Sequence, residues 1–93
     1  MYLAALNNCT EVARFLLERG ANVNAKSQDG ATGLHIAAQK DNLELVKLLL
    51  ANKADINAVD SKHRTPMDRA LEWHHPDIAA YLKKNGGRQG AQL

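Results

Sequence analysis

The chain has 93 residues, of which 45% are hydrophobic and 24% charged, and its net charge is +2. So small a charge, without a basic stripe interleaved with aromatic side chains, argues against nucleic acid as a partner. The apolar runs are far too short to cross a bilayer and no secretory leader opens the chain, so we expect no membrane partner and an intracellular location, cytoplasmic or nuclear.

A period of 33 residues runs through the chain. The segment Ala-Asn-Val-Asn-Ala at 21–25 returns as Ala-Asp-Ile-Asn-Ala at 54–58, and a weaker third copy runs from Asp60. A period of this length indicates stacked supersecondary units. It moves the functional question from a catalytic cleft to a repeated surface.

The first copy, residues 1–27, begins inside a helix and lacks an opening turn, which is typical of a piece of a longer array. Thr10 is expected to cap a helix over 11–19 that ends at Gly20. Cys9, the single cysteine, excludes an internal disulfide and favours a reducing compartment. We interpret it as a small filler in a turn between helices, since a nucleophile would need a base nearby.

The second copy, residues 28–60, is the clearest. Its polar turn leads to Thr32, the expected N-cap of a helix over 33–40. Asn42 is expected to cap a second helix over 43–52, whose leucines form a broad apolar face. An extended connector then leads to the next copy.

The third copy, residues 61–86, repeats this pattern with prolines. Thr65 and His75 each precede a proline, which is favoured at the first position of a helix. Gly86 and the glycine after it end the second helix. The remaining tail, 87–93, is rich in Gly and Gln, and we expect it to be disordered.

Two charged residues of the third copy replace apolar ones of the second. Arg69 stands in the place of Ile36, and Lys83 in that of Leu50. Charge at the surface where a next copy would dock is the pattern of a C-terminal cap. Each helix pair exposes an apolar face that only a neighbouring pair can bury, so the sequence predicts an all-α stack at about the minimum of three units.

The segments that recur resemble those of the ankyrin repeat family. The family's opening stands here as Thr32-Gly33-Leu34-His35-Ile36-Ala37-Ala38, and its closing segment as Leu16-Leu17-Glu18-Arg19-Gly20-Ala21-Asn22-Val23-Asn24-Ala25. The resemblance implies an ankyrin-repeat solenoid, an all-α stack of antiparallel helix pairs joined by β-turn-like loops. Its repeats would be 1–27 (partial), 28–60 and 61–86, with His35 in a structural hydrogen bond between loops.

The chain departs from this family at several glycines. Asn, Asp, Lys and His stand in their place at Asn8, Asp41, Lys53, His63 and His74. If these positions keep a positive φ, the Lys and His residues cost about 1 kcal/mol each. We therefore predict modest stability.

No nucleophile–base pair, phosphate-binding loop or carboxylate dyad has a usable spacing, so we predict neither an enzyme nor a cofactor site. His63, His74 and His75 lie near acidic residues, but adjacent histidines on a helix diverge, and no metal site is expected. Asn24 and Asn57 are interpreted as residues that bond the turn backbone. The resemblance leaves open that one of them is hydroxylated.

The function predicted is a non-catalytic module that binds another protein. In the ankyrin family, partners are usually held by the turn tips and the concave face of the first helices. The matching positions here are Gln28, Asp29, Ala31, Gln39, Lys40, Ser61, Lys62, Arg64, Glu72 and Trp73. Trp73 is either an exposed interface anchor or a cover that folds back over the terminal repeat.

Two further expectations concern the wider context. The array could instead be a targeting or substrate-recruiting fragment of a larger multidomain enzyme or effector. The first copy should also expose Leu3, Leu6 and Val12, which predicts self-association.

Overall fold

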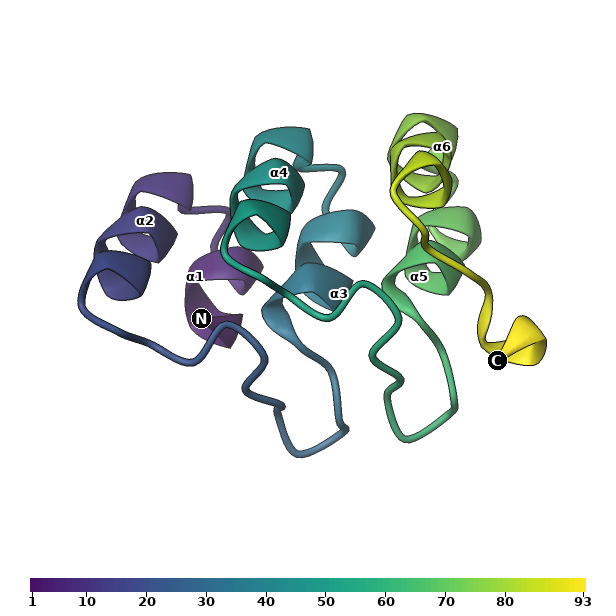
Figure 1. Ribbon diagram of the computed structural model, residues 1–93, viewed down its shortest axis with the longest axis horizontal. Coiled ribbons are helices and arrows are strands. Elements are labelled where there is room, and N and C mark those ends of the chain that lie inside the picture. Colours follow the sequence, from purple (N-terminus) through teal and green to yellow (C-terminus); the bar gives the residue numbers. More distant parts are fainter.

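The computed structural model describes all 93 residues, and its regular structure is entirely helical. The helices pair in antiparallel hairpins, and the loops between pairs project to one side of the stack (Figure 1). In chain order the elements are α1 Tyr2–Leu6, α2 Thr10–Glu18, α3 Gly33–Gln39, α4 Leu43–Ala51, α5 Pro66–Glu72, α6 Pro76–Lys84 and the 3₁₀-helix η1 Gly90–Gln92. The predicted all-α stack of helix pairs is confirmed.

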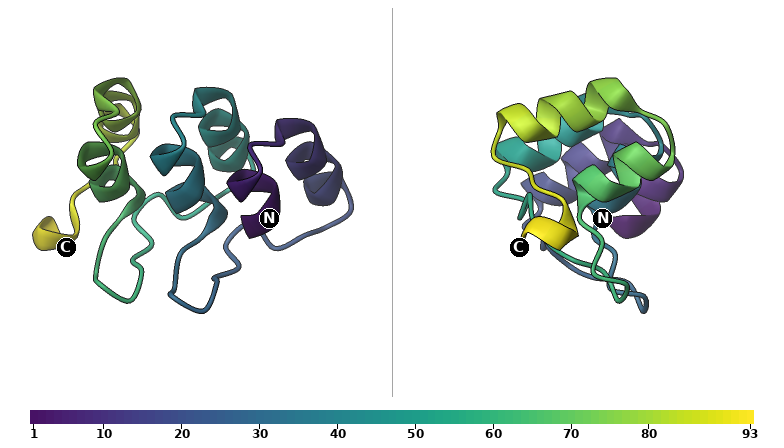
Figure 2. Two further views of the ribbon diagram at one scale, coloured as in Figure 1. Left: turned by 180° about the vertical axis from the view of Figure 1, so that it is seen from behind. Right: turned by 90° about the vertical axis from the view of Figure 1, so that its right-hand side faces the viewer.

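The helices form two rows. The first helices of the pairs (α1, α3 and α5) line one row on the side of the loops, and the second helices (α2, α4 and α6) form the other (Figure 2). The central helix α3 packs against α1, α4 and α5. The resulting stack measures 34 × 25 × 21 Å.

Threonine caps explain where the first helices begin. The Thr32 side chain accepts a hydrogen bond from the His35 amide, while the His35 ring accepts one from the Thr32 amide. Thr65 and Asp68 form the same reciprocal pair at the start of α5. Asn42 caps α4 as predicted. The helices α3 and α4 each end one residue earlier than predicted.

The start of α2 differs from the prediction. Cys9 holds the N-cap position without a capping hydrogen bond from its side chain, and Thr10 is already helical. The reason is register, because Cys9 and not Thr10 aligns with the capping residue Asn42. The Thr10 hydroxyl instead accepts a hydrogen bond from the Asn42 side chain at 3.2 Å, which ties α2 to α4.

Five residues other than glycine have a positive φ. They are the five predicted from the missing glycines: Asn8 (57°), Asp41 (58°), Lys53 (69°), His63 (60°) and His74 (60°). Left-handed backbone is tolerated by Asn and Asp and is less favourable for longer side chains. The strained turns are therefore those at Lys53, His63 and His74.

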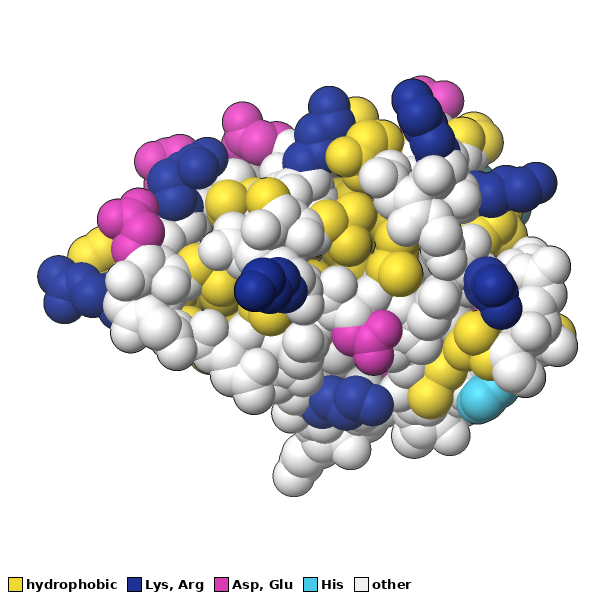
Figure 3. Space-filling view, viewed as in Figure 1, with side chains coloured by type: hydrophobic (Ala, Val, Ile, Leu, Met, Phe, Trp, Pro, Cys, Tyr) yellow, Lys and Arg dark blue, Asp and Glu magenta, His cyan; other side chains and the backbone are white.

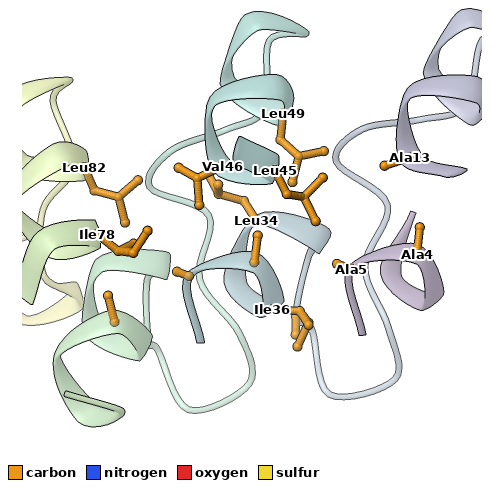
Figure 4. Packing of buried hydrophobic residues seen from close by; sticks show 14 of the residues in the cluster. Ala4, Ala5, Ala13, Leu34, Ile36, Leu45, Val46, Leu49, Ile78 and Leu82 are labelled. Carbon is orange, nitrogen blue, oxygen red and sulfur yellow. The ribbon is translucent and has the colours of Figure 1, made fainter. Parts of the chain in front are cut away.

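Buried side chains fill the space between neighbouring helix pairs (Figure 4). The largest of them are fully buried: Leu34, Leu45, Leu49, Ile78 and Leu82. Small buried residues, among them Ala5, Ala37, Ala38 and Ala70, lie on the first helices, where their size permits close approach between helices. The core is thus shared by successive pairs, as expected for a repeat array.

The prediction that Arg69 lies on the open terminal face is wrong. Arg69 is buried, and its guanidinium donates to the Gln39 side chain of the preceding helix pair at 2.7 Å. The equivalent residue of the second helix pair, Ile36, is buried. The equivalent residue of the first pair, Leu3, has no helix pair before it here and is 67% exposed. This position therefore faces backward along the stack. Lys83 is exposed on α6, as predicted.

The C-terminal segment, residues 86–93, differs from the disorder expected for 87–93. It crosses the end of the stack and returns to the start of α5 (Figure 2). The Arg88 amide donates to Asn57 at 2.8 Å, the Thr65 hydroxyl donates to the Arg88 carbonyl at 2.6 Å, and the Gly90 amide donates to Asp68 at 2.7 Å. These bonds fix backbone that its glycine content alone would leave free.

Candidate functional site

The loop before α5 is organised around one buried carboxylate. Asp60 accepts hydrogen bonds from the backbone amides of Lys62 and Arg64, both at 2.9 Å. Its second oxygen accepts from the Arg64 Nε at 2.8 Å and from the Arg69 guanidinium at 2.9 and 3.2 Å. One side chain thus sets the shape of the loop tip and anchors it to α5.

Arg69 joins this loop to the one before it. Besides Asp60 and Gln39, its guanidinium lies 3.8 Å from the exposed Asp29 carboxylate of the preceding loop. A buried cation is tolerated only with such partners, since a lone buried charge is strongly unfavourable. The Arg69 guanidinium thus contacts both adjacent loops.

Sequence reasoning missed Asp60 and Arg69 as site-building residues. The available signal was an arginine at a position where the helix pattern requires an apolar residue. Lys and Arg are almost never fully buried unless paired, so a carboxylate partner within reach should have been sought.

Two titratable groups of these loops have shifted pKa values. Burial raises the pKa of Asp60, but hydrogen bonds from the Arg64 amide, Arg69 and Lys62 outweigh it and hold the pKa far below its usual value. Burial lowers the pKa of His35, although a hydrogen bond to the Arg64 carbonyl opposes this. The neutral ring suits its contacts, because it accepts from the Thr32 amide and bonds the Arg64 carbonyl at 2.8 Å.

These shifts predict that stability falls on acidification. Below the ordinary pKa of 6.5, the unfolded chain takes up a proton at His35 that the folded chain does not, so the folded state loses stability. Below 3.8 the same argument applies to Asp60. Urea unfolding at intervals from neutral to acidic pH should show both losses, and His35→Gln should abolish the first. An equal free energy of unfolding above and below pH 6.5 would contradict this account.

The predicted contact residues are not equally accessible. Ala31 is fully buried and cannot touch a partner, because it packs in the core while its carbonyl accepts from the Ser27 amide at 2.8 Å. Asp29 and Gln39 both lie against Arg69. The exposed candidates without a side-chain bond are Gln28, Lys40, Ser61, Lys62 and Trp73.

Two candidates come together near α5. Arg64, held by Asp60, extends its guanidinium to Glu72 at 3.2 Å. Trp73 follows Glu72 at the C-terminal end of α5 and is 54% exposed. This exposure disfavours the alternative that Trp73 serves only as a cover over the terminal repeat.

Asparagine side chains hold the connectors between helix pairs. Asn24 accepts from the Asp55 amide at 2.7 Å and donates to the Lys53 carbonyl at 3.4 Å. Asn57 accepts from the Arg88 amide and donates to the Gly86 carbonyl at 3.2 Å. The predicted role in bonding turn backbone is confirmed.

Two cavities lie beside the third helix pair, and none of the predicted contact residues lines either of them. One of about 550 Å³ is lined by Met67, Lys83, Gly87, Arg88, Gln89 and Gln92. The other, of about 430 Å³, is lined by Leu71, His74, His75 and Pro76. No three His, Cys, Asp or Glu side chains cluster closely enough to hold a metal ion. None of the helices has the length and apolar character to traverse a bilayer.

Known proteins resemble the chain over most of its length. The family profile described as "Ankyrin repeats (3 copies)" matches residues 1–92. The "Ankyrin repeat and LEM domain-containing protein 1 homolog" of Caenorhabditis elegans is 53% identical over 66 residues, 69% of this chain and 9% of that protein. Diacylglycerol kinase iota of Homo sapiens is 35% identical over 86 residues, 89% of this chain and 8% of that protein.

Protein phosphatase 1 regulatory subunit 12A of Mus musculus is 38% identical over 84 residues, 90% of this chain and 8% of that protein. The chain thus spans less than a tenth of the length of these three relatives. Ankyrin repeats are protein–protein interaction modules and are generally non-catalytic. Its profile match, its period and its stacked helix pairs agree, and the chain belongs to the ankyrin repeat family.

Proposed function

We propose that the chain is a non-catalytic module that binds a protein partner through its loop tips and the exposed side of its first helices. The surface is made of Gln28, Asp29, Gln39, Lys40, Ser61, Lys62, Arg64, Glu72 and Trp73. The observation that carries the proposal is the loop before α5, where a buried carboxylate holds Arg64 against Glu72, the residue that precedes the exposed Trp73. The division into repeats at 1–27, 28–60 and 61–86 is part of this proposal.

Physical reasoning favours this part of the surface as the centre of binding. Tryptophan and arginine are the residues most enriched among those that dominate binding energies. Arg64 is held in place before a partner arrives, so less conformational freedom is lost on binding. Lys62 is presented by the same ordered loop.

The first experiment is affinity capture of a partner from the source cell, followed by Trp73→Ala. We expect this change to weaken the captured complex by about 2 kcal/mol or more, because truncating a central aromatic anchor removes its contact area. Binding should be measured by titration, and helicity by circular dichroism should be unchanged. Arg64→Ala should weaken the complex too.

The matched control is Phe15→Ala, which removes an exposed aromatic side chain from α2 on the opposite row. It should leave the affinity unchanged. If Trp73→Ala binds as tightly as the parent chain, the contact surface lies elsewhere.

A second candidate function is that of a targeting or substrate-recruiting part of a larger enzyme or effector. The observation that favours it is the small share, 8 or 9%, of each long relative that the chain covers. Reading the full-length frame around the chain distinguishes the two. A complete capping repeat directly upstream, with no other domain in the frame, would exclude this candidate.

We also propose self-association through the exposed apolar side chains of the first helix pair. Leu3, Leu6 and Val12 are all exposed, the first at 67%. A second copy could bury them, as Ile36 is buried within the stack. Sedimentation at micromolar concentration should therefore give a mass above 10.2 kDa that falls on dilution. A monomer throughout, or the same mass for Leu3→Glu, would contradict this.

A further inference from the structure

The C-terminal segment begins as a connector to a further repeat would. Asn57 bonds the Gly86 carbonyl and the Arg88 amide, just as Asn24 bonds the connector one repeat earlier. Beyond Arg88 the segment leaves that path and turns back to the start of α5 (Figure 2). It therefore closes over the end of the stack.

Two buried glycines allow this segment to seat closely. A Cβ at Gly87 would lie 2.8 Å from the Leu82 carbonyl, and one at Gly90 would collide with the His63 carbonyl. Asp68 receives the segment by accepting from the Gly90 amide. The matching residue of the second repeat, His35, bonds the Arg64 carbonyl of the next loop. Asp68 can only accept, so it suits the Gly90 amide that the C-terminal segment brings to this position.

The cavity of about 550 Å³ lies between this segment and α5 and α6. Lys83 and Arg88 line it, and neither forms an ion pair. No carboxylate lines the cavity. At the right-hand end of the molecule in Figure 3, dark-blue Lys and Arg side chains are visible, and magenta Asp and Glu side chains are visible only at the top. The partial negative charge at the C-terminal end of α6 offsets only part of two full cations.

The remaining lining suits a peptide. Met67 supplies an apolar surface, and Gln89 supplies a side-chain amide that can bond a peptide backbone. The Gln92 amide oxygen already accepts from the Gln89 amide at 2.8 Å, so Gln92 offers its side-chain NH₂ as a donor. The volume is within the range of about 300–1,000 Å³ found for ligand sites, far larger than a single inorganic anion needs. We propose that this cavity is a binding site for a short acidic peptide segment, whose carboxylates pair with Lys83 and Arg88. No residue of the proposed contact surface lines this cavity.

The test is a titration of labelled hexaglutamate at low salt, monitored by fluorescence anisotropy, with hexaglutamine as the neutral comparison. Hexaglutamate should bind and hexaglutamine should not. The double change Lys83→Glu and Arg88→Glu should weaken binding by about tenfold or more, because both pairing charges are reversed. Lys84→Glu, which makes the same change on α6 outside the cavity, should have a much smaller effect.

Gly90→Ala provides a second variant that leaves every charge in place. It should release the C-terminal segment, seen as faster exchange of the amide of residue 90, which donates to Asp68, and should weaken hexaglutamate binding with it. An equal loss from Lys84→Glu would mean general electrostatic attraction and overturn the proposal. Unchanged affinity after charge reversal or after release of the segment would do so too, as would full competition by inorganic phosphate at matched charge. None of these outcomes bears on binding through Trp73.

Discussion

Replacing Asp60 with alanine is expected to destabilise the protein by about 3–5 kcal/mol, because it leaves the buried Arg69 cation without its main partner. The same change frees the amides of Lys62 and Arg64, so the loop before α5 should lose its fixed shape. The loss is a large part of the about 5–15 kcal/mol that holds a typical domain folded. Urea unfolding followed by circular dichroism measures it.

Two further variants make this prediction specific. Asp77→Ala removes an exposed carboxylate from α6 and should cost about 1 kcal/mol or less, as expected for a charge in a first helical turn. Adding Arg69→Ile to Asp60→Ala restores the apolar residue of the second repeat and should recover part of the loss. Asp60→Ala with the stability of the parent chain would show that the ion pair does not hold the loops.

Truncating Leu49 to alanine is expected to cost about 2–5 kcal/mol. Leu49 is fully buried in α4, among the side chains that join the second helix pair to its neighbours (Figure 4). The central pair contacts both others, so a cavity there cannot be relieved by one end of the array. Equilibrium unfolding in urea provides the free energy.

The matched control is Leu3→Ala, since Leu3 is 67% exposed and loses the same atoms. Its effect on the free energy of unfolding should stay within about 0.5 kcal/mol. Similar losses at Leu3 and Leu49 would mean that burial between the helix pairs does not set stability.

The period and the capping residues were enough to predict the architecture. Thr32, Asn42 and Thr65 mark helix starts because their side chains can accept from free amides, and the structure has all three as caps. The positions at which another residue replaces a family glycine also predicted where φ is positive. This works because each repeat forms the same turn, whichever residue occupies the position. Local chemistry at a fixed period carries this information.

The direction in which Arg69 points could not be read from the period. An alignment of repeats shows which positions are equivalent, but it does not say whether a position faces the preceding or the following pair. The partner Asp60 lies in a loop, where a carboxylate is usually solvated. Of the predicted contact residues, Ala31 was misplaced for a related reason, because a residue in a turn can still pack into the core.

The C-terminal segment was beyond sequence reasoning for another reason. Its glycines indicate a flexible segment, yet Gly87 and Gly90 lie where a side chain would collide with backbone. The same absence of a Cβ that raises the entropy of the unfolded chain permits this close approach. Composition alone does not distinguish the two uses.

The most direct test of the proposed binding surface is amide hydrogen exchange of the chain with and without its captured partner. We expect slower exchange in the complex at residues 61–64 and at the C-terminal end of α5, around Trp73. The outer helices α2, α4 and α6 should be unaffected. Protection confined to those outer helices, with the loop before α5 and Trp73 unchanged, would contradict binding through the loop tips and first helices.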